Sequence, residues 1–334
     1  MHSIKRIFGA AALVFFSSYA SAQTAAAPIL IKISHVNPVN SPKNQAFEYF
    51  KKFAEEGTKG RVKIEIYPQS TLYKDKEELE ALQIGAVQML APTLGKFGPM
   101  GLRDFEAFDL PYLFDSFEQA HLVTQGPIGK QMLDQLDAKG IKGLAFWDNG
   151  FKQMSANKPL KKPDDFKGLK MRIFSSKVLD AEMRSLGAQP QVLAASEIYT
   201  SMQSGLVDGG ENTESTFYQF KMYEVQKYMT LSNHGYVGYA VVANKKFWEG
   251  LPPDIRSVLE EGLVKATEFG NRVAKKENDD ALEGIKATGR TQVSTLSPAD
   301  RDEWKKVMVK SHDAADRINK DTLKAIYKVT GAAK

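Results

Sequence analysis

Segments with strand periodicity and segments with helix periodicity alternate along this chain, and this alternation strongly constrains its fold class. Ile29, Ile31 and Ile33 recur at every second position, which predicts a strand. Ser41 and Pro42 then predict the N-cap and the first residue of a helix. Further segments are expected as a strand at 62–67, a helix around 79–83 and a strand at 87–91. Because a βαβαβ order implies parallel strands with helices on the faces, an α/β fold is predicted.

Similar segments recur in the second half of the chain. Strands are predicted at 143–147, 171–174 and 236–242, and helices at about 176–186, at about 196–205 and from Ser297 onward. A helical pattern from Pro253 to about Ala287 is long enough to lie across two domains. No flexible linker separates the halves. We therefore expect two α/β domains joined by strands and this long helix, with a cleft for a small ligand between them.

The first 22 residues have the pattern of a secretory signal peptide. Lys5 and Arg6 form a basic region, 7–16 is an uncharged apolar run, and 20–22 (Ala-Ser-Ala) matches a cleavage pattern. The apolar run is shorter than the roughly 20 residues that span a bilayer, which disfavours the alternative of a membrane anchor. We expect cleavage after about Ala22 and an exported protein in the periplasm.

Composition and motifs argue against several classes of function. The 334 residues contain no cysteine, which excludes thiolate metal sites and cysteine nucleophiles. The formal charge of +5 is too small and too dispersed to indicate nucleic-acid binding. The chain has no GxSxG, HExxH, P-loop or GxGxxG motif, and its histidines beyond the signal segment lie far apart in sequence. We expect no enzyme, no metal and no cofactor, with a secreted hydrolase or lyase as the alternative.

Hydrogen-bond donors gather instead at predicted strand ends and loops around the proposed cleft. They are Thr93, Lys96, Asn149, Lys152, Arg172 and Asn212. Arg172 lies in an otherwise apolar strand, so its guanidinium either extends outward to water or binds an anion. The planar guanidinium suits a carboxylate, which can accept two parallel hydrogen bonds. Composition alone leaves both interpretations of Arg172 open.

Four segments, in order along the chain, resemble the solute receptors of TRAP transporters. They are 166–172 (FKGLKMR), 196–199 (SEIY), 207–212 (VDGGEN) and 223–228 (YEVQKY). The likeness extends from about Ile29 to the C-terminal helix. It implies the α/β fold of two-domain periplasmic solute-binding proteins, with an interdomain cleft, hinge strands and a long domain-spanning helix. It also implies a receptor without catalytic activity, which delivers an organic acid to a permease of a small and a large membrane subunit driven by an ion gradient.

We expect the chain to divide in keeping with such a fold. After the signal peptide at 1–22, residues 23–149 and 238–277 are expected to form domain I. Residues 150–237 and 278–334 are expected to form domain II. The protein is expected to be a monomer that closes its two domains on the ligand.

The resemblance also implies roles for particular residues. Arg172 would form the central salt bridge to the ligand carboxylate, and Asn212 would donate to it from the following loop. Within the family, the likeness is closest to the C4-dicarboxylate receptors of the DctP type, through 149–153, 155–160 and 247–252. The ligand that follows is succinate, fumarate or malate, with a sugar acid, a keto acid or an aromatic acid as alternatives.

Departures from the sialic-acid branch of the family favour a ligand with two carboxylates. That branch carries a second arginine at the position of Lys152, a glutamate at that of Thr93 and a phenylalanine at that of Ala195. An acid is thus lost while the cations Lys96, Lys152 and Arg172 are kept. Lysine is a compact charge with rotatable donors, which suits a second carboxylate at variable distance.

Five of the binding candidates have a structural alternative. For Lys96 and Lys152 the alternative is a plain surface charge. His35 and Lys43 lie near the end of the first strand and the start of the first helix, where either role is open. Tyr239, on a strand predicted between the domains, either donates its hydroxyl to the ligand or packs in a core.

Overall fold

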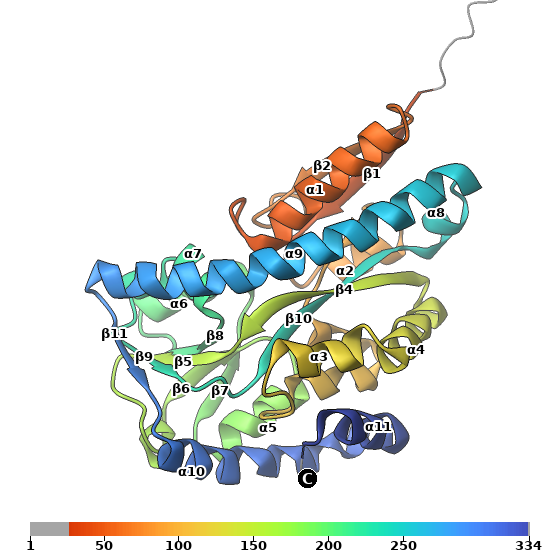
Figure 1. Ribbon diagram of the computed structural model, residues 1–334. Coiled ribbons are helices and arrows are strands. Elements are labelled where there is room, and N and C mark those ends of the chain that lie inside the picture. Colours follow the sequence, from red (N-terminus) through yellow and green to blue (C-terminus); the bar gives the residue numbers. More distant parts are fainter. Residues whose placement is uncertain (1–26, 333–334) are drawn as a thin grey trace, which may run out of the picture.

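The computed structural model describes residues 27–332, so the expected signal peptide at 1–22 lies outside the described residues. The described part folds into two β-sheets with helices packed around them (Figure 1). None of the helices in this part is both long enough and apolar enough to cross a membrane.

The first sheet has the strand order β2-β1-β3-β10-β4. β1 (Ile29–Ser34) pairs in parallel with β2 (Val62–Tyr67) and with β3 (Met89–Leu90), as the βαβαβ order predicts. β10 (Tyr236–Asn244) lies antiparallel to β3 and to β4 (Ile141–Phe151). The connecting helices are α1 (Pro42–Gly57) and α2 (Glu78–Gln83). The Ser41 side chain accepts a hydrogen bond from the backbone of Asn44, which confirms the predicted cap of α1.

The second sheet has the strand order β11-β9-β5-β8-β6-β7. Its strands are β5 (Gln153–Ala156), β6 (Lys170–Ile173), β7 (Gln189–Val192), β8 (Gly209–Asn212), β9 (Tyr228–Leu231) and β11 (Gln292–Thr295). β6 pairs in parallel with β7 and β8, whereas β5 is antiparallel to β8 and β9. Gly209 allows β8 to approach β5, since a Cβ there would lie 2.1 Å from the carbonyl oxygen of Ser155.

Two neighbouring segments carry the chain between the sheets. One passes from β4 to β5 at Lys152, and the other returns from β9 to β10 through 232–235. β4 and β10 pair from Phe151 with Tyr236 to Ile141 with Asn244. Lys152 N then donates to the carbonyl oxygen of Gly235 at 2.7 Å. The sheets are therefore joined by hydrogen-bonded strands rather than by a loose linker.

The long helix α9 (Pro253–Thr288) has 36 residues and runs past both sheets, close to the predicted range (Figure 1). It packs on α1 and β4 and, further along, on α7 (Glu214–Gln219). Leu259 enters the core of the first sheet, whereas Ile285 enters a core of the second. At Gly270 a Cβ would lie 2.9 Å from the Cβ of Ala46, so α9 and α1 cross closely.

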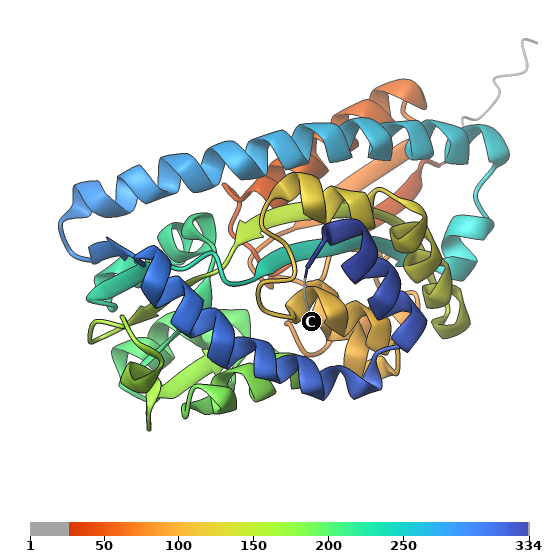
Figure 2. The same cartoon turned by 60° about the horizontal axis from the view of Figure 1, so that its bottom comes forward.

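The remaining helices cover the outer faces and edges. They are α3 (Phe117–Thr124), α4 (Pro127–Gln135), α5 (Lys177–Ser185), α6 (Ile198–Gln203), α8 (Lys245–Glu249), α10 (Pro298–Met308) and α11 (Lys320–Thr330). α10 packs on α5, and α11 lies against α3 and α4 (Figure 2). The position of α11 differs from the expectation that all of 278–334 belongs to domain II, because Ile326 is buried in a core on the side of the first sheet.

Candidate ligand-binding site

A cavity of about 60 Å³ lies where residues from the two sheets and their connecting segments meet. This volume accommodates several water molecules. Polar side chains from both sides line it: Lys43, Thr93, Lys96, Asn149 and Tyr239 from the first, and Arg172 and Asn212 from the second. Ala195 lines it as well. The cavity thus brings together seven of the nine predicted binding residues.

Arg172, on β6, provides a buried positive charge at the cavity. Arg172 is only 4% exposed. Its Nε and Nη2 atoms donate to the carbonyl oxygen of Leu193 at 3.2 and 2.9 Å. Burial lowers the pKa of Arg172 to about 10, which leaves it protonated at neutral pH. No carboxylate of residues 27–332 lies within 4 Å of this guanidinium. A bound anion would therefore compensate a buried charge that the described residues leave without an ion pair.

Lys43, in the first turn of α1, provides a second buried positive charge. Its Nζ atom donates to the carbonyl oxygen of Ala91 at 2.6 Å and lies 3.5 Å from the ring centroid of Tyr239. Burial lowers the pKa of Lys43 to about 7, with Glu78 acting to raise it and Lys96 to lower it. The charge of Lys43 is therefore readily changed by an anion beside it.

Asn149, at the end of β4, connects the two sides of the cavity through its side chain. Its Nδ2 atom donates to the hydroxyl of Tyr239 at 2.7 Å and to that of Thr216 at 3.2 Å. Its Oδ1 atom accepts from Thr213 and Ser215. Burial raises the pKa of Tyr239, which keeps its hydroxyl neutral and able to donate a hydrogen bond.

Thr93 and Asn212 complete the polar lining from opposite sides. Thr93 forms a backbone bridge with Tyr239, and its side chain does not cap the 3₁₀ helix η1 (Leu94–Met100) that follows. Asn212 ends β8 and directs its Nδ2 atom to the sulfur of Met222 at 3.6 Å, a weak interaction. Both side chains can therefore exchange their present surroundings for a ligand oxygen.

Lys96 lines the cavity, but its charge is already neutralised. Its Nζ atom donates to the carboxylates of Asp75 and Glu78 and, at 2.8 Å, to the carbonyl oxygen of Asp75. Although burial acts to lower it, these two carboxylates hold the pKa of Lys96 above its ordinary value. Lys96 is therefore not the exposed surface charge of the alternative interpretation, and its expected role in ligand binding stays a prediction.

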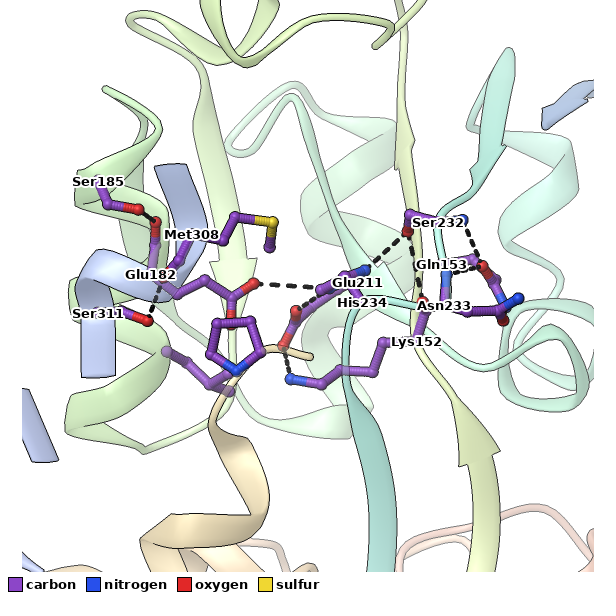
Figure 3. Close-up of polar contacts among 12 residues, drawn as sticks. Lys152, Gln153, Glu182, Ser185, Glu211, Ser232, Asn233, His234, Met308 and Ser311 are labelled. Atoms are coloured by element: carbon purple, nitrogen blue, oxygen red, sulfur yellow. Dashed lines mark hydrogen bonds and ion pairs between the residues drawn. The ribbon is translucent and has the colours of Figure 1, made fainter. Parts of the chain in front are cut away.

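Lys152 does not line the cavity. It belongs to a buried polar cluster with Glu211 and His234 (Figure 3). Its Nζ atom lies 3.0 Å from Glu211 Oε1, and both side chains are fully buried. Glu211 Oε2 lies 2.9 Å from His234 Nε2, and His234 Nδ1 lies 2.7 Å from the hydroxyl of Ser232. Glu211 also lines the cavity and precedes Asn212. Lys152 is thus connected to the cavity through Glu211 rather than lining it directly.

His35 is also outside the cavity lining. Its Nε2 atom lies 3.1 Å from Asn44 Oδ1, and its ring stacks on Phe47 with centroids 5.9 Å apart. Burial lowers the pKa of His35 to about 3, with Lys43 acting in the same direction. A neutral, packed imidazole supports the start of α1 from inside the first sheet.

The same buried cluster contains the groups in the described part of the chain that best resemble metal ligands. Ligand atoms of Glu182, Glu211 and His234 lie within 4.8 Å of one another. The Lys152 ammonium already binds Glu211, and burial raises the pKa of Glu182 well above its ordinary value, which favours its neutral form. Glu211 is thus already paired with Lys152, whereas both carboxyl oxygens of Glu182 are buried without a hydrogen-bond partner among the described residues. A neutral Glu182 and a Glu211 occupied by Lys152 are poor metal ligands, so we assign no metal to the cluster.

Three acidic residues at the cavity escaped the sequence interpretation. Asp75 and Glu78 lie in the charged segment 74–80, which has the pattern of an exposed turn and helix. Glu211 directly precedes Asn212 in the segment 207–212 (VDGGEN), so its position in the sequence could have identified it as a candidate. For the other two, the sequence carries no signal, because their importance depends on contact with Lys96.

The two-sheet α/β fold with a cation-lined cavity between its parts is that of a solute-binding protein. Residues 33–317 match the family described as DctP, bacterial extracellular solute-binding protein, family 7. The chain belongs to this family. Membership confirms the predicted fold class and the expectation of a solute receptor rather than an enzyme.

Known proteins similar to this chain cover nearly its whole length. It is 54% identical over 328 residues to the C4-dicarboxylate-binding periplasmic protein DctP of Rhodobacter capsulatus, covering 98% of each chain. A TRAP periplasmic solute-binding protein of Shewanella oneidensis with bound succinate has a TM-score of 0.89 and 39% identity, over 91% of this chain and 100% of that one. One of Pseudomonas aeruginosa with bound L-malate has a TM-score of 0.84 and 39% identity, over 86% of this chain and 100% of that one. These likenesses confirm the predicted resemblance to TRAP receptors.

Proposed function

We propose that this protein is the periplasmic receptor of a TRAP transporter and binds a C4-dicarboxylate such as succinate, fumarate or malate. The observation that carries the proposal is the pair of buried cations, Arg172 and Lys43, which reach one small cavity from opposite sides. Two positive charges in a space of this size match the two carboxylates of a short diacid. The similar proteins described above support this proposal, because one is named as C4-dicarboxylate-binding and two have bound succinate or L-malate.

In the proposed complex, Arg172 and Asn212 bind one carboxylate and the first-sheet side binds the other. Arg172 keeps its Nε and Nη2 bonds to Leu193, so its remaining N–H groups serve the ligand. Lys43, Thr93 and the hydroxyl of Tyr239 receive the second carboxylate. We assign this role to Lys43 rather than Lys152, because Lys152 is bonded to Glu211 outside the cavity lining.

Domain closure completes the proposed site. We retain the expected division into 23–149 plus 238–277 and 150–237 plus 278–334, apart from α11. The passages between the sheets at Lys152 and at 232–235 support it. When both sides close, the carboxylates leave water, where charge-assisted hydrogen bonds are stronger.

Calorimetry against a panel of acids tests the proposal. The protein should bind succinate, fumarate or malate without turnover, and more tightly than galactonate, pyruvate or benzoate, which represent the sugar, keto and aromatic acids. NMR of the ligand after prolonged incubation would detect chemical conversion. Preference for one of the three comparison acids would replace the ligand assignment, and conversion would indicate a hydrolase or lyase.

We extend the proposal to the location of the protein, its oligomeric state and its membrane partners. The receptor is a monomer that loses residues 1–22 on export, binds no nucleic acid, and delivers its ligand to the small and large membrane subunits of the permease. Periplasmic proteins among its relatives support this location. Co-purification with the two membrane subunits in the presence of ligand would test the partnership.

A further inference from the structure

An ion cluster at the edge of the cavity has no role in the proposed binding of the ligand. It consists of Asp75, Glu78 and Lys96, which we call the polar wall. The side chains are 13, 3 and 10% exposed. Because Lys96 donates to both carboxylates, the polar wall is a well-anchored unit rather than a set of mobile surface groups.

The polar wall stands between the ligand cavity and a second cavity of about 320 Å³. Asp75 and Lys96 line both cavities, and apolar side chains such as Leu79 and Met100 line much of the second one. Asp75 Oδ2 also accepts from the backbone N–H of Ala195 at 3.4 Å. This bond reaches from the loop before α2 to the second-sheet side, so the polar wall closes the cavity across the cleft.

The polar wall lies beside the position proposed for the second carboxylate. The three residues of the polar wall line the same small cavity as Lys43, and all three act electrostatically on its ammonium. A diacid longer than four carbons would push its second carboxylate past Lys43 toward Asp75 and Glu78. Contact between the ligand carboxylate and these two acids is unfavourable, because like charges repel. Lys96 cannot offset the repulsion, since its ammonium is already paired with both acids.

We propose that the polar wall sets the length of the dicarboxylate that this receptor accepts. It fills the space into which a longer chain would extend, and it presents two carboxylates to any group that enters. The presence of Asp75 and Glu78, two of the three acids at this site for anions, is thereby explained: they hold Lys96 in place and repel longer diacids. This inference rests on the proposed function and specifies its substrate class further.

Two double variants separate the volume of the polar wall from its charge. Asp75→Ser/Lys96→Ser removes most of both side chains, and because one acid and one base are lost, the net charge is unchanged. Asp75→Asn/Lys96→Met removes the same charges but keeps the volumes. Calorimetry with succinate, glutarate and adipate gives the ratio of the Kd for each longer diacid to the Kd for succinate.

The wild-type protein should bind succinate most tightly. In Asp75→Ser/Lys96→Ser the ratio for adipate should fall by at least about tenfold, comparable to the effect of a methylene group in a fitted pocket. In Asp75→Asn/Lys96→Met it should change by less than about threefold. Circular dichroism checks that each variant is folded. If the serine double variant does not fold, Asp75→Ser alone, at a loop position, should lower the ratio in the same direction.

Other outcomes would overturn the inference. A folded serine variant that binds succinate with the wild-type ratio would show that the polar wall does not limit length. An equal change in both double variants would overturn the claim that the polar wall limits length by filling space, because the Asn/Met variant keeps the volume. If the wild-type protein binds none of the three diacids, the proposed function is overturned and this inference with it.

Discussion

Asn278, in the long helix α9, donates its side-chain amide to the carbonyl oxygen of Asn149 in β4 at 2.7 Å. The Oδ1 atom of Asn278 accepts from the backbone N–H of Ser215 at 2.9 Å. Asn149 in turn donates to the hydroxyls of Tyr239 and Thr216 at the cavity. One side chain of α9 therefore ties the helix to both segments that meet at the ligand site.

Asn278→Ala should destabilise the protein, because the carbonyl oxygen of Asn149 and the N–H of Ser215 lose their partner. Asn278 is 8% exposed, so water replaces these bonds poorly. We expect the free energy of unfolding to fall by about 1–3 kcal/mol, measured by denaturant titration. Lys275→Ala, on the exposed face of the same helix, is the control and should change it by less than about 0.5 kcal/mol. Equal effects of the two substitutions would contradict a structural role for Asn278.

Arg172→Lys should weaken succinate binding by at least about 1.5 kcal/mol, because lysine keeps the charge but loses the planar fork. Arg172→Ala should cost about 3 kcal/mol or more, since it leaves a carboxylate poorly paired in a closed site. Circular dichroism should stay native for both. A folded Arg172→Ala protein with near wild-type affinity in calorimetry would remove the basis of the site.

The affinity for a dicarboxylate should fall as the pH rises above 7. Burial lowers the pKa of Lys43 to about 7, so the ligand-free ammonium is partly deprotonated at neutral pH. A carboxylate favours the protonated form, so binding takes up a proton. The affinity is highest below the pKa of the free protein and declines above it, by up to about tenfold per pH unit.

Calorimetry between about pH 6.5 and 8.5 would measure this slope, with Lys43→Met as the matched control. The comparison is needed because burial also raises the pKa values of Asp109 and Glu214 to about 7. The variant should bind more weakly and lose most of the pH dependence. A slope that persists in Lys43→Met would assign the titration to another group.

Lys152→Met should destabilise the whole fold rather than weaken one ligand contact. It leaves the buried Glu211 without its ion pair, at a cost of about 3–5 kcal/mol in the free energy of unfolding. The double variant Lys152→Met/Glu211→Gln should recover much of this loss, because no unpaired charge remains. If Lys152→Met were as stable as the wild type and lost affinity for diacids only, Lys152 would contact the ligand after all.

The exported protein should begin at Gln23 or within a residue or two of it. Residues 20–22 (Ala-Ser-Ala) provide the small residues that signal peptidase requires after the apolar run. Intact-mass spectrometry of the periplasmic fraction checks this. An exported protein that retains Met1 to Ala22 would contradict it, and Ala22→Leu should block cleavage.

Local patterns determined most of the elements that position the site. The alternation of Ile29, Ile31 and Ile33 predicted β1, and Ser41 predicted the cap of α1. The helical pattern after Pro253 predicted α9, which the structure ends at Thr288. These features depend on spacing along one segment, so the sequence contains all the information that they need.

The family and Arg172 could also be found from sequence, because an arginine in an apolar strand is rare and belongs to an extended motif. The roles of the lysines could not. Lys43, Lys96 and Lys152 look alike as exposed or ligand-binding cations in a sequence. The charge that each presents depends on which acids the fold brings to it.

The sequence by itself therefore determined the α/β class, the long helix and the family, and it singled out Arg172 as the main binding candidate. Only the tertiary structure decided that Lys152 is bonded to Glu211, that Lys96 is held by Asp75 and Glu78, and that Lys43 faces the cavity. The physical reason is that a charge acts through space on whatever lies within a few ångströms, in a medium whose screening depends on burial. Asp75 and Ala195 are 120 positions apart, and only folding brings them into contact.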